Sequence, residues 1–279
     1  KFIPQMIELG KDYGVTGVWI DGDCWAMVPS YTKHHMDEFY KRTGFKTVDE
    51  DITSESNIAF RQYWREIFLD YLRHIMTEIK KECPDMKLSS NGAFGSLMPQ
   101  KVIEETDFLT FDASRQGREV RMLIRSFQRK NKHFEMNSWG MCDCVENKDF
   151  GFAPRAPKSE NRLCREAAMA ISFGGGYMVT YNMTEQGEIR MTELENTKIL
   201  SDFVYARKEW NWQSVSTVNA AVLHSDYDCM RRTPDLLRYY DGAEEMCDII
   251  IDGGRPVDVI YDYEILEDNW VIQNCPVSF

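Results

Sequence analysis

The sequence predicts an α/β protein, the later part of a (β/α)8 TIM barrel followed by a small open parallel sheet. Short apolar strands alternate five times with helices or with connections long enough to hold a crossover helix. Polar side chains follow these strands, at the end where such barrels carry their active sites. The strands are expected at 17–20, 86–91, 107–113, 133–140 and 177–182, as strands four to eight of the barrel.

Helices are expected between these strands. The clearest is 57–82, whose apolar residues keep helical spacing until Pro84 ends it. The long loop 22–56 is expected to contain a short helix. The expected helices are 1–13, a short one within 31–44, 57–82, 160–172 and 193–210.

The barrel part is expected to span 1–213 and a second domain 214–279. This domain is predicted to hold strands at 218–225, 256–262 and 269–276, with a helix at 232–247. The turn after its first strand, "HSDYD", lacks a Gly-x-Gly-x-x-Gly pattern, so no dinucleotide site is expected. Because no Cys nucleophile stands in a strand–turn–helix with a following His, we expect no amidotransferase chemistry.

Composition narrows the function. Of 279 residues, 43% are hydrophobic, which suffices for a packed core, and the net charge of −12 argues against nucleic acid as a partner. No apolar run approaches the roughly 20 residues of a membrane span, so no membrane partner is expected. Cys142 and Cys144 form a lone Cys-x-Cys without matching partners, so we expect free thiols, no metal and no cofactor. The chain is expected to be an excerpt of a longer, cytoplasmic, homo-oligomeric protein.

The stretch "GVWIDGDCW" (17–25) raises the functional question, because a buried strand runs directly into Asp21. One interpretation is an ordinary Asp-Gly turn. The other is a catalytic carboxylate at a strand end. Further polar side chains follow the later strands, among them Asn91, Asp112 and Glu135.

Four segments resemble the retaining α-L-fucosidases. "ELGKDYGVTGVWIDG" (8–22) is similar to the family's "ELxxxYxPxxxWFDG", and "DFLTFD" (107–112) to its "DYxTPE". "FEMNSWGM" (134–141) echoes "WExxxTxxxSWGY", and "GGGYMVTYNMTEQGEI" (174–189) echoes "GGNLLLNxGPxxDGxI". The second domain resembles the amidotransferase-like sheet that follows the barrel in β-galactosidases and in one fucosidase branch. Typical fucosidases carry a β-sandwich there, so the resemblance implies a divergent relative.

The resemblance implies a double displacement with Asp21 as nucleophile. Asp112 takes the place of the family's acid/base glutamate, one methylene shorter, and Glu135 is the rival for that role. No arginine follows Asn91-Gly92, where the family often has Asn-Asp-Arg, so one sugar contact is missing. Candidate substrate contacts, for which a structural role is the alternative, are Trp19, Trp25, Asn91, Arg115, Trp139, Tyr181 and Asn182.

The expected function is therefore a retaining glycosidase of carbohydrate metabolism, acting on an α-L-fucoside. Two alternatives stay open. The substrate is another sugar, such as an α- or β-galactoside, or the protein is a catalytically silent carbohydrate-binding or oligomerisation protein.

Overall fold

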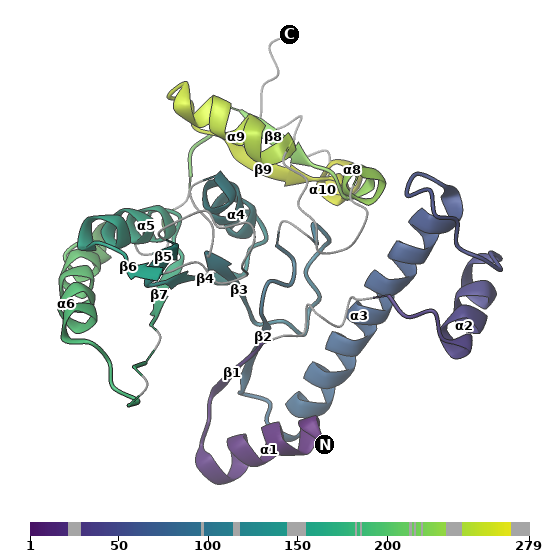
Figure 1. The fold of residues 1–279 in the computed structure, drawn as a ribbon, viewed down its shortest axis with the longest axis horizontal. Helices are drawn as coiled ribbons and strands as arrows, with labels where there is room; N and C mark the ends of the chain where they lie inside the picture. Colours follow the sequence, from purple (N-terminus) through teal and green to yellow (C-terminus); the bar gives the residue numbers. More distant parts are fainter. Residues whose placement is uncertain are drawn as a thin grey trace.

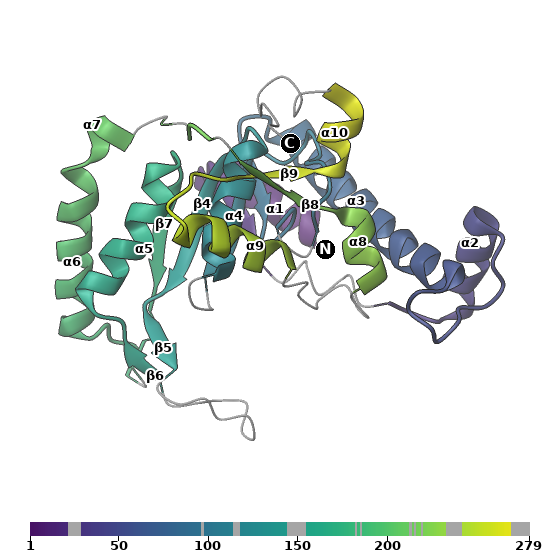
Figure 2. The same cartoon turned by 90° about the horizontal axis from the view of Figure 1, so that it is seen from above.

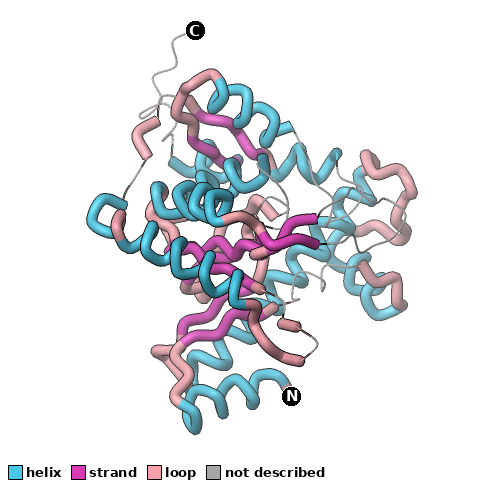
Figure 3. The backbone as a smooth tube through the Cα atoms, turned by 60° about the vertical axis from the view of Figure 1, so that its left-hand side comes forward, coloured by secondary structure: helices cyan, strands magenta, loops and turns pink. Residues whose placement is uncertain are grey.

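The computed structural model of the chain describes residues 1–21, 29–95, 98–113, 118–143, 155–181, 183–184, 186–211, 214, 216–218, 220–232 and 242–268. Five parallel strands lie side by side in chain order (Figure 1): β1 (Gly17–Ile20), β2 (Lys87–Ser90), β3 (Phe108–Ala113), β4 (His133–Trp139) and β7 (Gly176–Thr180). A short antiparallel hairpin, β5 (Met141–Asp143) and β6 (Arg155–Pro157), follows β4. A second parallel sheet contains β8 (Ala221–His224) and β9 (Asp258–Tyr261), set apart from the other strands in Figure 3.

The helices surround these strands. In chain order they are α1 (Phe2–Tyr13), α2 (Lys33–Thr43), α3 (Glu55–Glu82), α4 (Arg118–Arg129), α5 (Glu160–Ser172), α6 (Met191–Tyr205), α7 (Lys208–Asn211), α8 (Asp226–Arg232), α9 (Gly242–Asp252) and α10 (Asp262–Asp268). Figure 2 shows α5 and α6 beside β7 at one end of the molecule and α2 at the other. None of the described helices combines the length and apolarity of a membrane span.

The five strands divide into a two-stranded sheet, β1-β2, and a three-stranded sheet, β3-β4-β7. A parallel bridge between Asn91 and Thr110 and a 2.9 Å bond from the Asp107 amide to the Leu88 carbonyl join the two sheets. The α/β class and the parallel order are thus confirmed. A closed eight-stranded barrel is not shown, because the parallel sheets of the described residues hold two or three strands each.

The sequence explains the longest helix well. The Ser54 hydroxyl caps α3 by accepting a 3.2 Å hydrogen bond from the Asn57 amide, and the helix ends at Glu82, ahead of Pro84. Its apolar side, including Phe60, Phe68 and Leu72, is buried in the main core against the strands.

Helix α4 was not named in the sequence analysis, and its composition explains why. One side is apolar and buried in the main core, including Leu123 and Phe127. The other side carries Arg121, Arg125 and Arg129, which are spaced four residues apart and face the second sheet and its helices. Arg121 lies 2.9 Å from Asp252, and Arg129 lies 2.7 Å from Glu264. The interface of α4 is therefore partly ionic, which a search for apolar spacing does not detect.

Two helix predictions were wrong in their bounds. The helix expected at 232–247 is α9, which runs from 242 to 252, and a separate helix, α8, ends at Arg232. The helix expected at 193–210 breaks into α6 and α7, because the Arg207 amide bonds three residues back, to Val204, and tightens the last turn. The strand expected at 269–276 lies outside the described residues.

The second sheet is packed onto the five strands through α4 and α8. Figure 1 shows α4 between the strands β3 and β4 and the helix α9, with which it is in contact. Met122 of α4 belongs to the core around Val222 and Val259, and Met230 of α8 is buried in the main core. In the described part of 91–107, which connects β2 to β3, there is no helix, and α8 packs against α3 nearby.

Candidate functional site

The strands separate their side chains by face. Ile20, Leu88, Phe111 and Met136 are buried in the main core. Because successive strand residues alternate, their neighbours point to the opposite face, called the front face below. The polar side chains on the front face near the carboxyl ends of the strands are Asp21, Asn91, Asp112, Asn137 and Thr180.

One amide nitrogen connects the two aspartates that the sequence analysis assigned to catalysis. Asn91 Nδ2 donates to Asp21 Oδ1 at 2.8 Å and to Asp112 Oδ2 at 3.1 Å. Because both bonds start at one nitrogen, the two carboxylate oxygens lie at most about 6 Å apart. Asp21 and Asp112 are 91 positions apart in the chain, and the parallel strands bring them together.

Asp112 is held from its other side as well. Asn137 Nδ2 donates to Asp112 Oδ1 at 2.7 Å, and the Thr180 hydroxyl donates to Asn137 Oδ1 at 2.8 Å. The hydroxyl contact orients the Asn137 amide so that its N–H group faces the carboxylate. We call Asp21, Asn91, Asp112, Asn137 and Thr180 the front network.

The burial of the front network is graded. Asn91 and Asn137 are buried, Asp112 is half-buried, and Asp21 is exposed. The two amides are therefore fixed donors inside the fold, while the carboxylates are within reach of a molecule from solvent. This arrangement can hold two acids at a set separation beside a bound ligand.

Glu135, the rival acid/base, lies on the same face but two residues before Asn137, towards the amino end of β4. Its register partner on β3 is Thr110, whereas Asp112 pairs with Asn137. Its carboxylate lies 3.4 Å from His133 Nε2, near the amino end of β4. The structure thus brings Asp21 and Asp112 together and leaves Glu135 outside their hydrogen-bond network.

The candidate sugar contacts are distributed unevenly. Trp139 lies on the front face, two residues beyond Asn137, and is half-buried. Trp19 lies one layer below Asp21, and its indole nitrogen is buried. The Tyr181 hydroxyl, in contrast, lies 3.3 Å from Thr197 Oγ1 on α6, away from Asp112. Trp25, Arg115 and Asn182 lie outside the described residues.

Sequence reasoning placed Asn137 at a strand end but overlooked Thr180. Strand alternation was the available signal, because position 180 shares a face with position 182. The amino-acid types in the front network, Asp, Asn and Thr, did not indicate that Thr180 belongs to it, since hydroxyl and amide side chains are common at strand ends.

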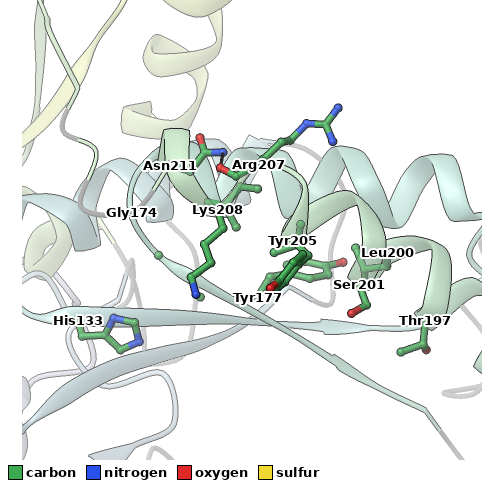
Figure 4. A pocket seen from close by; sticks show the side chains of 14 residues that line it. His133, Gly174, Tyr177, Thr197, Leu200, Ser201, Tyr205, Arg207, Lys208 and Asn211 are labelled. Carbon is green, nitrogen blue, oxygen red and sulfur yellow. Dashed lines mark hydrogen bonds between the residues drawn. The ribbon is translucent and has the colours of Figure 1, made fainter.

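A cavity of about 470 Å³ lies elsewhere, between β7 and α6. Its lining is mainly apolar and aromatic and includes Tyr177, Leu200, Val204 and Tyr205, with Lys208 at its rim (Figure 4). No member of the front network lines it, so this cavity and the paired carboxylates are different places. Within the described residues, no three His, Cys, Asp or Glu side chains are grouped to hold a metal ion.

The chain has a glycoside hydrolase-like fold, as two solved structures show. α-L-Fucosidase isoenzyme 2 from Paenibacillus thiaminolyticus matches 96% of this chain with a TM-score of 0.68 at 15% identity. The β-galactosidase from Bacillus circulans sp. alkalophilus matches 74% with a TM-score of 0.54 at 13% identity. The chain spans 38% of the length of the fucosidase and 34% of the galactosidase.

At such identities the likeness establishes the fold alone. No protein-family profile matches the sequence. No curated protein sequence matches it either.

Proposed function

We propose that the chain is the carboxylate-bearing part of a retaining glycoside hydrolase that resembles the α-L-fucosidases. The observation that carries the proposal is the shared Asn91 amide, which holds Asp21 and Asp112 within about 6 Å. Retaining glycosidases separate their two carboxyl groups by about 5–5.5 Å, whereas inverting enzymes need about 6.5–9.5 Å. The upper bound set by Asn91 thus favours retention.

The proposed reaction is a double displacement. The Asp21 carboxylate attacks the anomeric carbon while Asp112, as the acid, gives its proton to the departing glycosidic oxygen. Asp112, now a carboxylate, takes a proton from water. The resulting hydroxide oxygen attacks the anomeric carbon, releases the sugar and restores the Asp21 carboxylate. Asp21 is assigned as the nucleophile because it is the more exposed of the two and aligns with the family's nucleophile.

We further propose that three strands precede Lys1 and complete an eight-stranded barrel, and that the second domain spans 214–279. The separate β8-β9 sheet supports this, as does the fold match to proteins more than twice as long. Activity should therefore be measured on the protein with its preceding segment.

The test is hydrolysis of p-nitrophenyl α-L-fucoside beside the α- and β-galactosides. Asp21→Ala and Asp112→Ala should each lose about a thousandfold or more in kcat, and azide should restore turnover to both. Glu135→Ala is the matched control and should keep most of the wild-type rate. Wild-type rates in Asp21→Ala, or the large loss in Glu135→Ala instead of Asp112→Ala, would contradict the assignment.

The same panel separates the alternatives. Hydrolysis of a galactoside in place of the fucoside would identify another sugar. Absence of turnover on all three substrates, with saturable binding of a monosaccharide, would favour the silent carbohydrate-binding protein.

A further inference from the structure

A buried charged cluster lies behind β4, on the face opposite the carboxylates. Lys158 Nζ lies 2.9 Å from Ser138 Oγ and 2.9 Å from Glu166 Oε2, and the Ser138 hydroxyl donates to the same Glu166 oxygen at 2.6 Å. Arg162 Nε reaches the other Glu166 oxygen at 3.0 Å, and the Tyr177 hydroxyl donates to Oε2 at 3.3 Å. We call Ser138, Lys158, Arg162, Glu166 and Tyr177 the back network.

The back network is mostly buried and holds two cations, Lys158 and Arg162, against one carboxylate, Glu166. The Lys158 side chain is 2% exposed and that of Glu166 13%. Burial acts to raise the pKa of Glu166, but the hydrogen bonds from Ser138 and Lys158 outweigh it and hold that pKa below its ordinary value. Burial also raises the pKa of Tyr177, so its hydroxyl keeps its proton and acts as a donor. The bonds among Ser138, Lys158 and Glu166 therefore serve to hold the fold together.

The backbone of Lys158 makes two more contacts, one with the end of β4 and one with α6. Its amide donates to the Gly140 carbonyl at 2.8 Å, directly after β4. Its carbonyl accepts a 3.2 Å bond from Asn196 Nδ2 on α6. Because Lys158 immediately follows β6, it connects the end of the β5-β6 hairpin to β4, α5 and α6.

Trp139 stands between two residues that Lys158 contacts, Ser138 in β4 and Gly140 directly after it. Ser138 is bonded to the Lys158 side chain, and Gly140 to its backbone. The Gly140 amide also donates to the Thr180 carbonyl at 2.8 Å, which fixes this segment against β7. Strand alternation directs Ser138 to the back and Trp139 to the front, on the same face as Asn137.

We propose that Lys158 is a positioning residue that holds the Trp139 indole at the front network, where it forms a wall of the sugar site. The proposal rests on the function proposed above. Asn137 is bonded to Asp112, and Trp139 lies two residues beyond it, about 7 Å along the strand. A ring at that distance can stack on a sugar whose anomeric carbon lies between Asp21 and Asp112.

The first experiment compares Lys158→Met/Glu166→Gln with the wild type on the aryl glycoside that the wild type hydrolyses. The double substitution removes both charges, so neither is left buried and unpaired. We expect KM to rise about tenfold with kcat nearly unchanged, because stacking binds substrate and transition state alike. Lys198→Met, which breaks the exposed Lys198–Asp202 pair on α6, is the control and should change neither constant.

A double-mutant cycle with Trp139→Ala distinguishes positioning from general support. If Lys158 acts through Trp139, removing the indole first should abolish the effect of the Lys158 substitution on KM. Independent losses that multiply, or an unchanged KM in the Lys158 variant, would overturn the proposal.

Hydrogen exchange supplies a readout that does not depend on activity. The amides of 138–141 should exchange faster in the Lys158 variant than in the wild type, while those of α3 stay protected. Unchanged exchange at 138–141 would overturn the positioning role even in an active enzyme. A wild type without turnover on any glycoside, combined with faster exchange in the variant, would refute the proposed function. It would still show that Lys158 holds the segment around Trp139 in place.

Discussion

The two faces of β4 carry buried polar networks of opposite character. On the front, the carboxylate of Asp112 accepts hydrogen bonds from two neutral amides, those of Asn91 and Asn137. On the back, the carboxylate of Glu166 faces two cations, Lys158 and Arg162. The front is exposed to solvent at Asp21, whereas Ser138 and Lys158 at the back are buried.

Under the proposed function, one strand would keep the reacting carboxylates on one face and a structural tie on the other. Neutral amides fix the position of a carboxylate without cancelling its charge, so the acid stays available for reaction. Cations at hydrogen-bond distance neutralise Glu166 and make it a structural tie. Under the proposed function, changes on the front should affect kcat, whereas changes on the back should affect stability and, through Trp139, KM.

The largest effect should come from removing the Glu166 carboxylate from the back network. Glu166→Ala leaves the Lys158 ammonium buried without its main counter-charge and should lower the free energy of unfolding by about 3–5 kcal/mol. Urea denaturation measures this, with the exposed Asp202→Ala as the control, whose effect should be a few tenths of a kcal/mol. Equal small losses in both variants would show that the back network is not a structural tie.

Removing the shared donor on the front should change the rate with little change in stability. Asn91→Ala should lower kcat about a hundredfold, because one preorganised donor serves both carboxylates. Ser89→Ala, two residues earlier on the front face of β2, is the matched control and should retain the wild-type kcat. A wild-type kcat in Asn91→Ala would contradict the proposed role of the front network in the reaction.

A smaller effect is expected one step further from the carboxylates. Thr180→Val keeps the shape of the side chain but removes the donor that orients the Asn137 amide. The loss should be about fivefold in kcat, which corresponds to one ordinary hydrogen bond. Steady-state kinetics on the same glycoside would test it, and a loss as large as that of Asn91→Ala would contradict the proposed order within the network.

The smallest effect is a pH dependence of the free energy of unfolding, which arises from Glu166 in the back network. Because the folded-state pKa of Glu166 lies below its ordinary value of 4.5, its contribution is complete above that value and is lost as the pH falls through the folded pKa. The difference in urea midpoint between the wild type and Glu166→Gln should therefore narrow from pH 6 towards pH 3. A constant difference across this range would show that the charge of Glu166 does not contribute.

The sequence allowed the parallel strands and the convergence of Asp21 and Asp112 to be predicted, because both follow from strand period and strand ends. It did not reveal the role of Asn91, whose two donor contacts depend on the register of β2 between its neighbours. The back network escaped notice because Ser138, Lys158 and Glu166 are of ordinary types and meet only after α5 packs on β4.

Other predictions stay open for a different reason. The sugar-contact roles of Trp25, Arg115 and Asn182 fall on positions outside the described residues. Under the proposed function, the choice of sugar would depend on hydroxyl contacts that several chain segments supply together. Neither follows from the spacing of residues along one strand.

The burial of Met230 among the side chains of the main core has a consequence for how this protein can be divided. A chain cut after residue 213 would lose that methionine and the acidic partners of the α4 arginines, and would uncover apolar surface beside α3 and α4. The last quarter of the sequence thus covers apolar surface of the rest, and a chain shortened to the five strands and their helices should aggregate.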